Sequence, residues 1–158
     1  MTLTLVSVLD GDDPVKVKLP RPPDDVRARI EKVCKDLDAQ LPSEVLGHGA
    51  RKTVPDSKLT AAWGNPAIVL RCGVPKPVSL RPGDPNYDPE QNALGANGVD
   101  WTFEFLGKDK GVRLTTLHRE VNVELTVPAK YAEPGGVTTA FADAIKRTVP
   151  ATIGDGAS

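Results

Sequence analysis

The sequence predicts a two-layer α+β domain in which an antiparallel sheet of about 4–6 strands carries two helices packed on one face. Several runs of residues alternate between apolar and polar side chains and are separated by short turns, which is typical of an antiparallel meander. Two other segments, 24–40 and 137–149, repeat apolar residues at helical spacing. The chain has 158 residues, the length of one domain.

The predicted elements are separated by proline and glycine. Pro22 and Pro23 precede the helix 24–40, since proline and acidic residues favour a helix start. The segment 42–58 is predicted mainly as loop, with room for a brief strand near 51–54, and 81–98 is predicted as a long surface loop. The predicted strands are 15–19, 67–72, 99–106, 112–117 and 121–127, with 59–63 as either a strand or a short turn.

Alternation assigns the side chains of these strands to two faces of the sheet. Along 99–106 the residues Val99, Trp101, Phe103 and Phe105 share one face, which we expect to be buried. The opposite face is predicted to be polar and solvated, with opposite charges paired between strands. It includes Arg71, Asp100, Glu104, Arg113 and Glu124.

The two cysteines have two open interpretations. Cys34 lies on the apolar stripe of the helix 24–40, and Cys72 shares a strand face with Ile68 and Leu70. If the helix packs on that face, the sulfurs could meet in a disulfide, which would indicate an oxidising compartment. Otherwise they are two buried free thiols that pack as small apolar groups.

The ends of the chain are expected to lie outside the domain 15–150. Residues 3–9 are mostly apolar and an acidic linker follows to residue 14, so 1–14 is predicted as the stump of an N-terminal hydrophobic segment. The alternatives are a buried first strand or a disordered terminus. Residues 151–158 are predicted as a disordered tail.

The charge balance and the small number of possible metal ligands argue against some classes of function. Lys and Arg number 20 against 21 Asp and Glu, and this balance excludes a broadly basic nucleic-acid binder. With only two cysteines and two histidines, no metal site and no cofactor are predicted. His48 lies in a predicted loop and His118 at a predicted hairpin turn. At both positions a solvated side chain is a simpler interpretation than a catalytic base.

The loop 81–98 places polar residues at the two-residue spacing of a calcium-binding loop. Pro89 and Gly95 occupy the sixth and twelfth positions, where that pattern requires glycine and glutamate, so a polar loop rich in turn formers is favoured. The spaced residues are Asp84, Asn86, Asp88, Glu90 and Asn92.

The sequence contains no nucleophile motif and no phosphate-binding glycine loop. Trp101 lies on the apolar alternation and is expected in the core. Trp63 precedes a turn, where it is either core or the lining of a groove. The candidate residues for binding a ligand or partner are Trp63, Asn65, Arg71 and Asp100.

Two sequence blocks carry a family resemblance. Ala-Ala-Trp-Gly at 61–64 and Leu-Arg-Cys-Gly at 70–73, with the 97–101 and 121–128 segments and Tyr131, resemble the domain-of-unknown-function family 3515, common in actinobacteria. The resemblance covers residues 15–150 and includes a helix-borne cysteine that matches Cys34. It implies paired cysteines, Cys34 with Cys72, in a small exported or membrane-anchored protein. It transfers no catalytic residue.

These observations favour a non-enzymatic, extracytoplasmic domain of the cell envelope, membrane-anchored or secreted. Its membrane tether would lie upstream, and its partner would be an envelope protein or a cell-wall component. The binding surface would combine the Trp63–Pro66 turn, the loop 81–98 and the polar sheet face. One alternative is a cell-wall-directed hydrolase that uses Asp100 and Glu104, and another is a structural subunit that pairs with a second copy.

Overall fold

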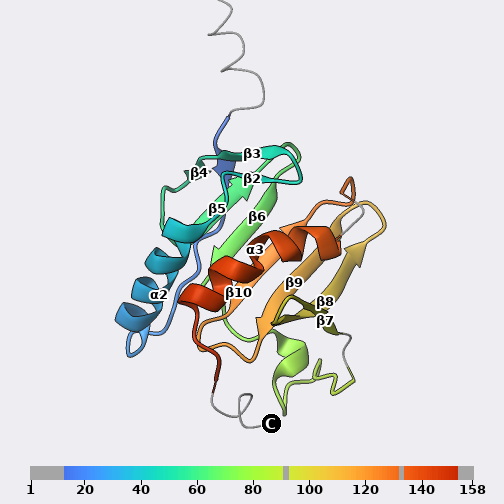
Figure 1. The fold of residues 1–158 in the computed structure, drawn as a ribbon. Coiled ribbons are helices and arrows are strands. Elements are labelled where there is room, and N and C mark those ends of the chain that lie inside the picture. The colour runs from blue at the N-terminus through green and yellow to red at the C-terminus, as the bar shows by residue number, and fades with distance from the viewer. Residues whose placement is uncertain (1–12, 91–92, 132–133, 153–158) are drawn as a thin grey trace, which may run out of the picture.

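The computed structural model describes residues 13–90, 93–131 and 134–152. Eight strands form one sheet in the order β2-β3-β5-β6-β10-β9-β8-β7, and all neighbours in it are antiparallel (Figure 1). The strands are β2 (Glu44–Val45), β3 (His48–Arg51), β5 (Thr60–Trp63), β6 (Ile68–Cys72), β7 (Ala93–Ala96), β8 (Val99–Gly107), β9 (Gly111–Leu117) and β10 (Val123–Val127).

The sheet exceeds the predicted 4–6 strands because three strands lie in segments predicted as loops. β2 and β3 fall within 42–58, and β7 falls within 81–98. Backbone pairing defines these peripheral strands, and their short or glycine-containing sequences lack the alternation that reveals a half-buried strand. The brief strand predicted near 51–54 is β4 (Thr53–Val54), which pairs in parallel with β1 (Val15–Lys16) in a separate two-stranded sheet.

The central strands form the predicted meander and bury one continuous face. Leu114 of β9 lies opposite both Phe103 of β8 and Leu125 of β10, and Leu125 in turn lies opposite Leu70 of β6. Leu70, Leu114 and Leu125 are at most 2% exposed. These leucines, which lie opposite one another on neighbouring strands, therefore form the sheet side of the hydrophobic core.

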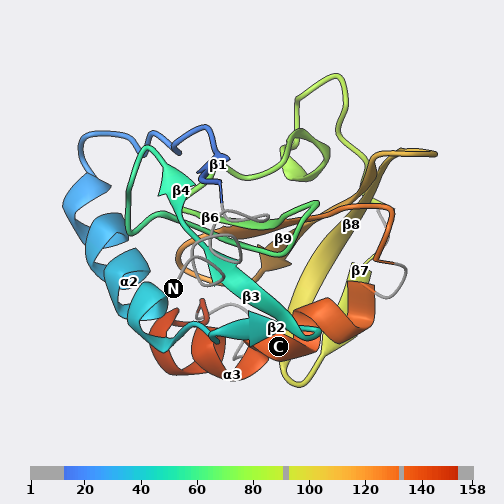
Figure 2. The ribbon, with the colours of Figure 1, turned by 90° about the horizontal axis from the view of Figure 1, so that it is seen from above.

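Helices α2 (Arg27–Gln40) and α3 (Pro134–Thr148) contact each other and lie against this apolar face (Figures 1 and 2). The buried stripe of α2 is the one that its sequence predicts, and α3 adds aromatic and aliphatic side chains to the same core. Neither helix within the described residues is long and apolar enough to cross a membrane. The buried helical residues include Val33, Cys34, Leu37, Val137, Phe141 and Ile145.

The boundaries differ from the predictions by a few residues. Residues 24–26 form a turn before α2, and α3 begins three residues earlier than predicted, at Pro134, since proline fits the first helical turn. Ala151 pairs with Arg119 in an isolated bridge, and the Thr152 amide donates to His118. The rest of the predicted tail, and the predicted hydrophobic segment 3–9, lie outside the described residues.

Phe105 departs from the prediction of a fully buried row on β8. Val99 and Trp101 on the same face have no exposed surface, whereas 71% of Phe105 is exposed. The hairpin of β8 and β9 extends past α3, so the helices do not cover its far end (Figure 1). Alternation along β8 thus assigns the face correctly, but coverage depends on where the helix layer stops.

Candidate functional site

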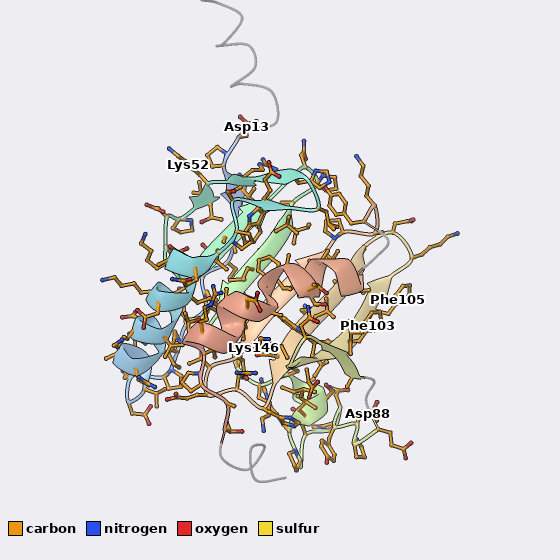
Figure 3. All side chains as sticks on the ribbon, in the orientation of Figure 1. Asp13, Lys52, Asp88, Phe103, Phe105 and Lys146 are labelled. Carbon is orange, nitrogen blue, oxygen red and sulfur yellow. A yellow bond between two sulfur atoms is a disulfide. The ribbon has the colours of Figure 1, made fainter. Side chains whose placement is uncertain are left out.

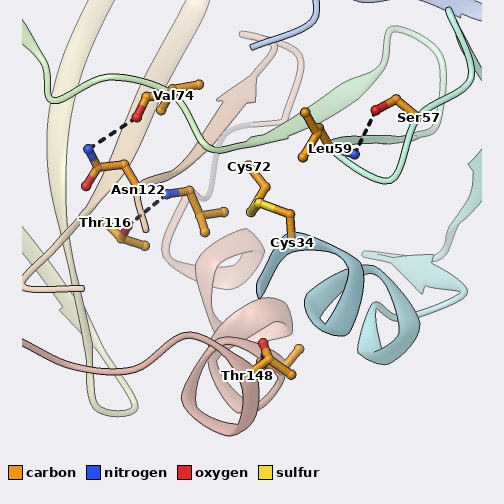
Figure 4. Close-up of a disulfide and its surroundings, with 10 residues drawn as sticks. Cys34, Ser57, Leu59, Cys72, Val74, Thr116, Asn122 and Thr148 are labelled. Atoms are coloured by element: carbon orange, nitrogen blue, oxygen red, sulfur yellow. Dashed lines mark hydrogen bonds between the residues drawn. A yellow bond between two sulfur atoms is a disulfide. The ribbon is translucent and has the colours of Figure 1, made fainter. Parts of the chain in front are cut away.

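A disulfide joins Cys34 of α2 to Cys72 at the end of β6 (Figure 4). The S–S distance is 2.05 Å, the Cα atoms are 5.8 Å apart, and neither cysteine is exposed. Gly73 follows the bridge with a φ of +94°, and a Cβ there would lie 2.8 Å from the side chain of Ile30. The glycine lets α2 approach the sheet closely enough for the sulfurs to bond.

The face of the sheet opposite the helices carries two arginine–glutamate pairs. Arg71 of β6 contacts Glu124 of β10 at 3.1 Å, and these neighbours in the ladder are 23% and 13% exposed at their side chains. Arg71 also donates from Nε to the Lys18 carbonyl at 2.9 Å. The segment after β1 is therefore bonded to this face.

The second pair lies on the neighbouring strands β9 and β8. Arg113 donates to both carboxylate oxygens of Glu104, at 3.4 and 3.2 Å. The hydrogen bonds to Glu104 raise the pKa of Arg113, and the charges of Glu104 and Glu124 act in the same direction. The two pairs thus form one alternating array of charge across the four neighbouring strands β6, β10, β9 and β8.

A groove of about 270 Å³ lies over this array. The segment 74–78 and the side chain of Arg81 border it, and we call it the polar groove. Two carboxylates face four cationic residues, so an anionic group is the complementary occupant. Its charged residues are Arg71, Lys76, Arg81, Glu104, Arg113 and Glu124.

Both glutamates of the polar groove are paired with arginine. Glu124 contacts Arg71 at 3.1 Å, and Glu104 contacts Arg113 at 3.2 Å. Arg71 and Arg113 are in turn positioned by their glutamates, which leaves fixed N–H groups beside the groove.

The predicted site residues do not converge on the polar groove. Arg71 lies in it, but Trp63 is only 1% exposed and belongs to the core. The Trp63 indole donates to the Pro42 carbonyl at 3.0 Å, and its ring meets Phe141 edge-on at a centroid distance of 5.0 Å. Asn65 is exposed in the turn beyond β5, so it lies at a different place from Arg71.

Asp100 lies near the start of β8 and is exposed, outside the residues that line the polar groove. Glu104 is four residues further along the same strand, lines the polar groove and is paired with Arg113. The Asp100 carboxylate lies beside Gly95 of β7. The structure therefore places Asp100 outside the groove that holds Glu104.

Within the described residues, no group of three or more His, Cys, Asp or Glu side chains could hold a metal ion. The Asp84 carboxylate accepts the amide of Asn86 at 2.8 Å, and the Asp88 carboxylate accepts the amide of Glu90 at 3.0 Å. These side chains stabilise turns of their own loop, which explains the two-residue spacing.

Two residues lie in surroundings that the sequence does not predict. The sequence predicts only a loop at Arg81, and no sequence signal places it over the sheet. His48 was expected to be solvated, but it is half-buried at the start of β3, with its ring 4.8 Å from that of Tyr131. Tyr131 in turn donates its hydroxyl to the Pro66 carbonyl at 2.7 Å.

Comparison with known proteins confirms the family resemblance and adds no characterised relative. Neither a curated protein nor a solved structure matches the chain significantly. One family model matches residues 4–153, and its description is protein of unknown function (DUF3515). This match covers nearly the whole sequence. The chain is therefore a member of the DUF3515 family.

Proposed function

We propose that this chain is a non-enzymatic binding or accessory domain of the cell envelope, held outside the cytoplasmic membrane by a tether at its N-terminal side. The observation that carries the proposal is the Cys34–Cys72 disulfide. Disulfides persist in oxidising, extracytoplasmic compartments and are rare where cellular thiols keep cysteines reduced. The apolar segment 3–9 and its acidic linker support the tether.

The polar groove is the proposed binding surface. Arg71 and Arg113 are already oriented by Glu124 and Glu104, so these two side chains lose little freedom when a ligand binds. Its excess of cationic groups favours carboxylate or phosphate groups, and polymers and peptides of the cell wall supply both. The proposed partner is an anionic component of the envelope.

The compartment can be tested by blocking free thiols in intact cells before lysis. We expect Cys34 and Cys72 to take up label only after reduction, and a C-terminal epitope to react with a membrane-impermeant reagent without lysis. Thiols that label without reduction in the intact cell would overturn the proposal.

Binding can be tested by pelleting the purified chain with isolated cell-wall sacculi. We expect Arg81→Met with Arg113→Met to weaken retention by at least about tenfold, because two cationic groups of the groove are lost. Arg29→Met with Arg147→Met is the matched control, since it removes two exposed arginines on the helices outside the groove. Equal retention of the groove variant and the control would reject the groove as the binding surface.

A further inference from the structure

One end of the sheet exposes apolar side chains at two hairpins. Leu46 lies in the turn between β2 and β3 and is 48% exposed. Phe105, near the turn between β8 and β9, is the most exposed of the large apolar side chains in the described residues. The pairing registers place both turns at the end of the sheet where β5 and β10 finish. We call this the hairpin end.

The apolar surface at the hairpin end continues from Phe105 into a shallow groove of about 370 Å³. Phe103, Val112 and Tyr131 line it beside Phe105. Phe103 is half-buried and packs against the core, whereas Phe105 is exposed, and Figure 3 labels both on the hairpin side of α3. Tyr131 presents a ring to this groove while its hydroxyl is hydrogen-bonded to Pro66, as suits a boundary between water and an apolar phase.

Three lysines lie on the segments next to Phe105, and one of them, Lys108, lines the groove. Lys108 and Lys110 lie in the turn between β8 and β9 and are exposed, with Asp109 between them. Lys130 follows β10 and is exposed. The segment before Lys130 packs directly against the start of β9, because Gly111 has no side chain and the backbone of Val127 to Ala129 occupies that space.

The described chain also begins at the hairpin end. Arg51 donates one guanidinium nitrogen to the Gly64 carbonyl and another to the Asp13 carbonyl, so Asp13 lies beside the end of β5. Leu9, the last residue of the apolar segment 3–9, precedes Asp13 by four residues in the sequence. Four residues span at most about 14 Å. A segment anchored in a bilayer would hold the hairpin end at the bilayer surface.

We propose that the hairpin end is a membrane-contacting surface that docks on anionic lipid headgroups. Phe105 and Leu46 enter the headgroup region, and Lys108, Lys110 and Lys130 bind the lipid phosphates. The contact rests on the proposed tether and adds an orientation to it. The polar groove then lies on a sheet face that runs away from the bilayer, open to envelope partners.

The charges around Phe105 favour a lipid surface over a second copy of this chain. The exposed acidic residues Asp13 and Glu44 lie on the other side of the sheet, beside β3 and in β2. A symmetric dimer through the hairpin end would place the lysines of the two copies near one another, and like charges repel. The exposed apolar groups also stand on separate turns, whereas a stable protein interface needs a contiguous, well-packed area. Separate aromatic and aliphatic tips with a basic rim suit a fluid, anionic surface.

The test is co-sedimentation with vesicles of phosphatidylglycerol and phosphatidylcholine in equal parts, and with phosphatidylcholine alone. We expect stronger binding to the anionic vesicles, and Lys108→Gln with Lys110→Gln and Lys130→Gln to weaken it by roughly a hundredfold. The matched control is Lys32→Gln with Lys35→Gln and Lys146→Gln, which changes net charge equally on the helices. Every variant keeps segment 3–9, so that segment cannot account for a difference.

A second readout reports contact at a single residue. Trp63 and Trp101 are buried, so brominated phosphatidylglycerol should not quench their fluorescence. In Phe105→Trp we expect the new indole to be quenched. In the control Tyr87→Trp we expect no quenching of the new indole. Equal binding of the two lysine variants, or a Phe105→Trp indole that lipid bromine does not quench, would overturn the proposal. Self-association in light scattering that Phe105→Ser abolishes would also overturn it, in favour of a dimer. None of these results tests the compartment, which thiol blocking in cells decides separately.

Discussion

Trp101 and Phe105 lie on the same face of β8, four residues apart, and have opposite surroundings. Trp101 has no exposed surface, whereas Phe105 is 71% exposed. The alternation of β8 treats them alike. The difference comes from elements that are remote in sequence, because the helix layer covers Trp101 and stops short of the tip of the β8–β9 hairpin.

Long-range bonds tie the chain together at the end of the sheet opposite Phe105. Cys72 ends β6 there and is bonded to α2, and Arg29 of α2 contacts Glu120 after β9 at 2.8 Å. Arg119 donates to the carbonyls of Val149 and Gly98, both at 3.0 Å. The hairpin end has long-range bonds of its own, from Trp63 to Pro42 and from Tyr131 to Pro66, so the contrast is confined to the tip of the β8–β9 hairpin around Phe105.

The sharpest test of this contrast compares Trp101→Ala with Phe105→Ala. We expect Trp101→Ala to lower the free energy of unfolding by about 3–5 kcal/mol, because it leaves a cavity in the packed core. Phe105→Ala should change it by less than about 0.5 kcal/mol, as is usual for exposed positions. Urea unfolding of both variants measures the two values. Similar losses would mean that the hairpin end is part of the stabilising core.

The next largest expected effect on stability comes from removing the disulfide. Replacing Cys34 and Cys72 together by alanine should lower the free energy of unfolding by about 2–4 kcal/mol, since the bridge restricts the unfolded chain across a separation of 38 residues. Thermal unfolding with and without reductant measures it. The reductant should lower the midpoint of the wild-type chain only. An equal response in the double variant would show that the reductant acts elsewhere.

The smallest expected effect on stability concerns the ion pair between Arg29 and Glu120. The hydrogen bond from Arg29 lowers the pKa of Glu120 below its usual value. The pair therefore contributes stability above the usual glutamate pKa of about 4.3, and this contribution is lost as pH falls through the lowered pKa. Both side chains are largely exposed, so the effect is modest.

Glu120→Gln isolates that contribution. We expect the variant to have a lower thermal midpoint than the wild-type chain at pH 7, and the gap to close as the pH falls towards 2. A gap that persists unchanged at low pH would assign the loss to packing and not to charge.

The sequence predicted the central fold because its strands carry alternation and its helices carry stripes. Residues 99–127 were placed correctly as a meander, and the stripe of α2 indicated the face that holds Cys34. β3 and β7 were missed because backbone pairing to a neighbour defines them, and their own side chains carry no pattern. The extent of helix coverage over Phe105 is likewise a property of the assembled layers.

The candidate site was less predictable than the fold. The polar face with Arg71, Glu104, Arg113 and Glu124 follows from alternation, and the structure pairs these residues across strands. The position of Arg81 over that face depends on how the loop after β6 folds back, which spacing does not encode. For Trp63 the sequence leaves both the core and a groove open, and the structure places it in the core.

The bridge between Cys34 and Cys72 makes residues 35–71 part of a covalent macrocycle that contains β2, β3, β4 and β5. A protease that cuts one peptide bond inside this ring releases no fragment. The mass rises by one water, and the two pieces separate only on a reducing gel. This half of the sheet therefore keeps its connection to α2 and β6 even after a single backbone cleavage.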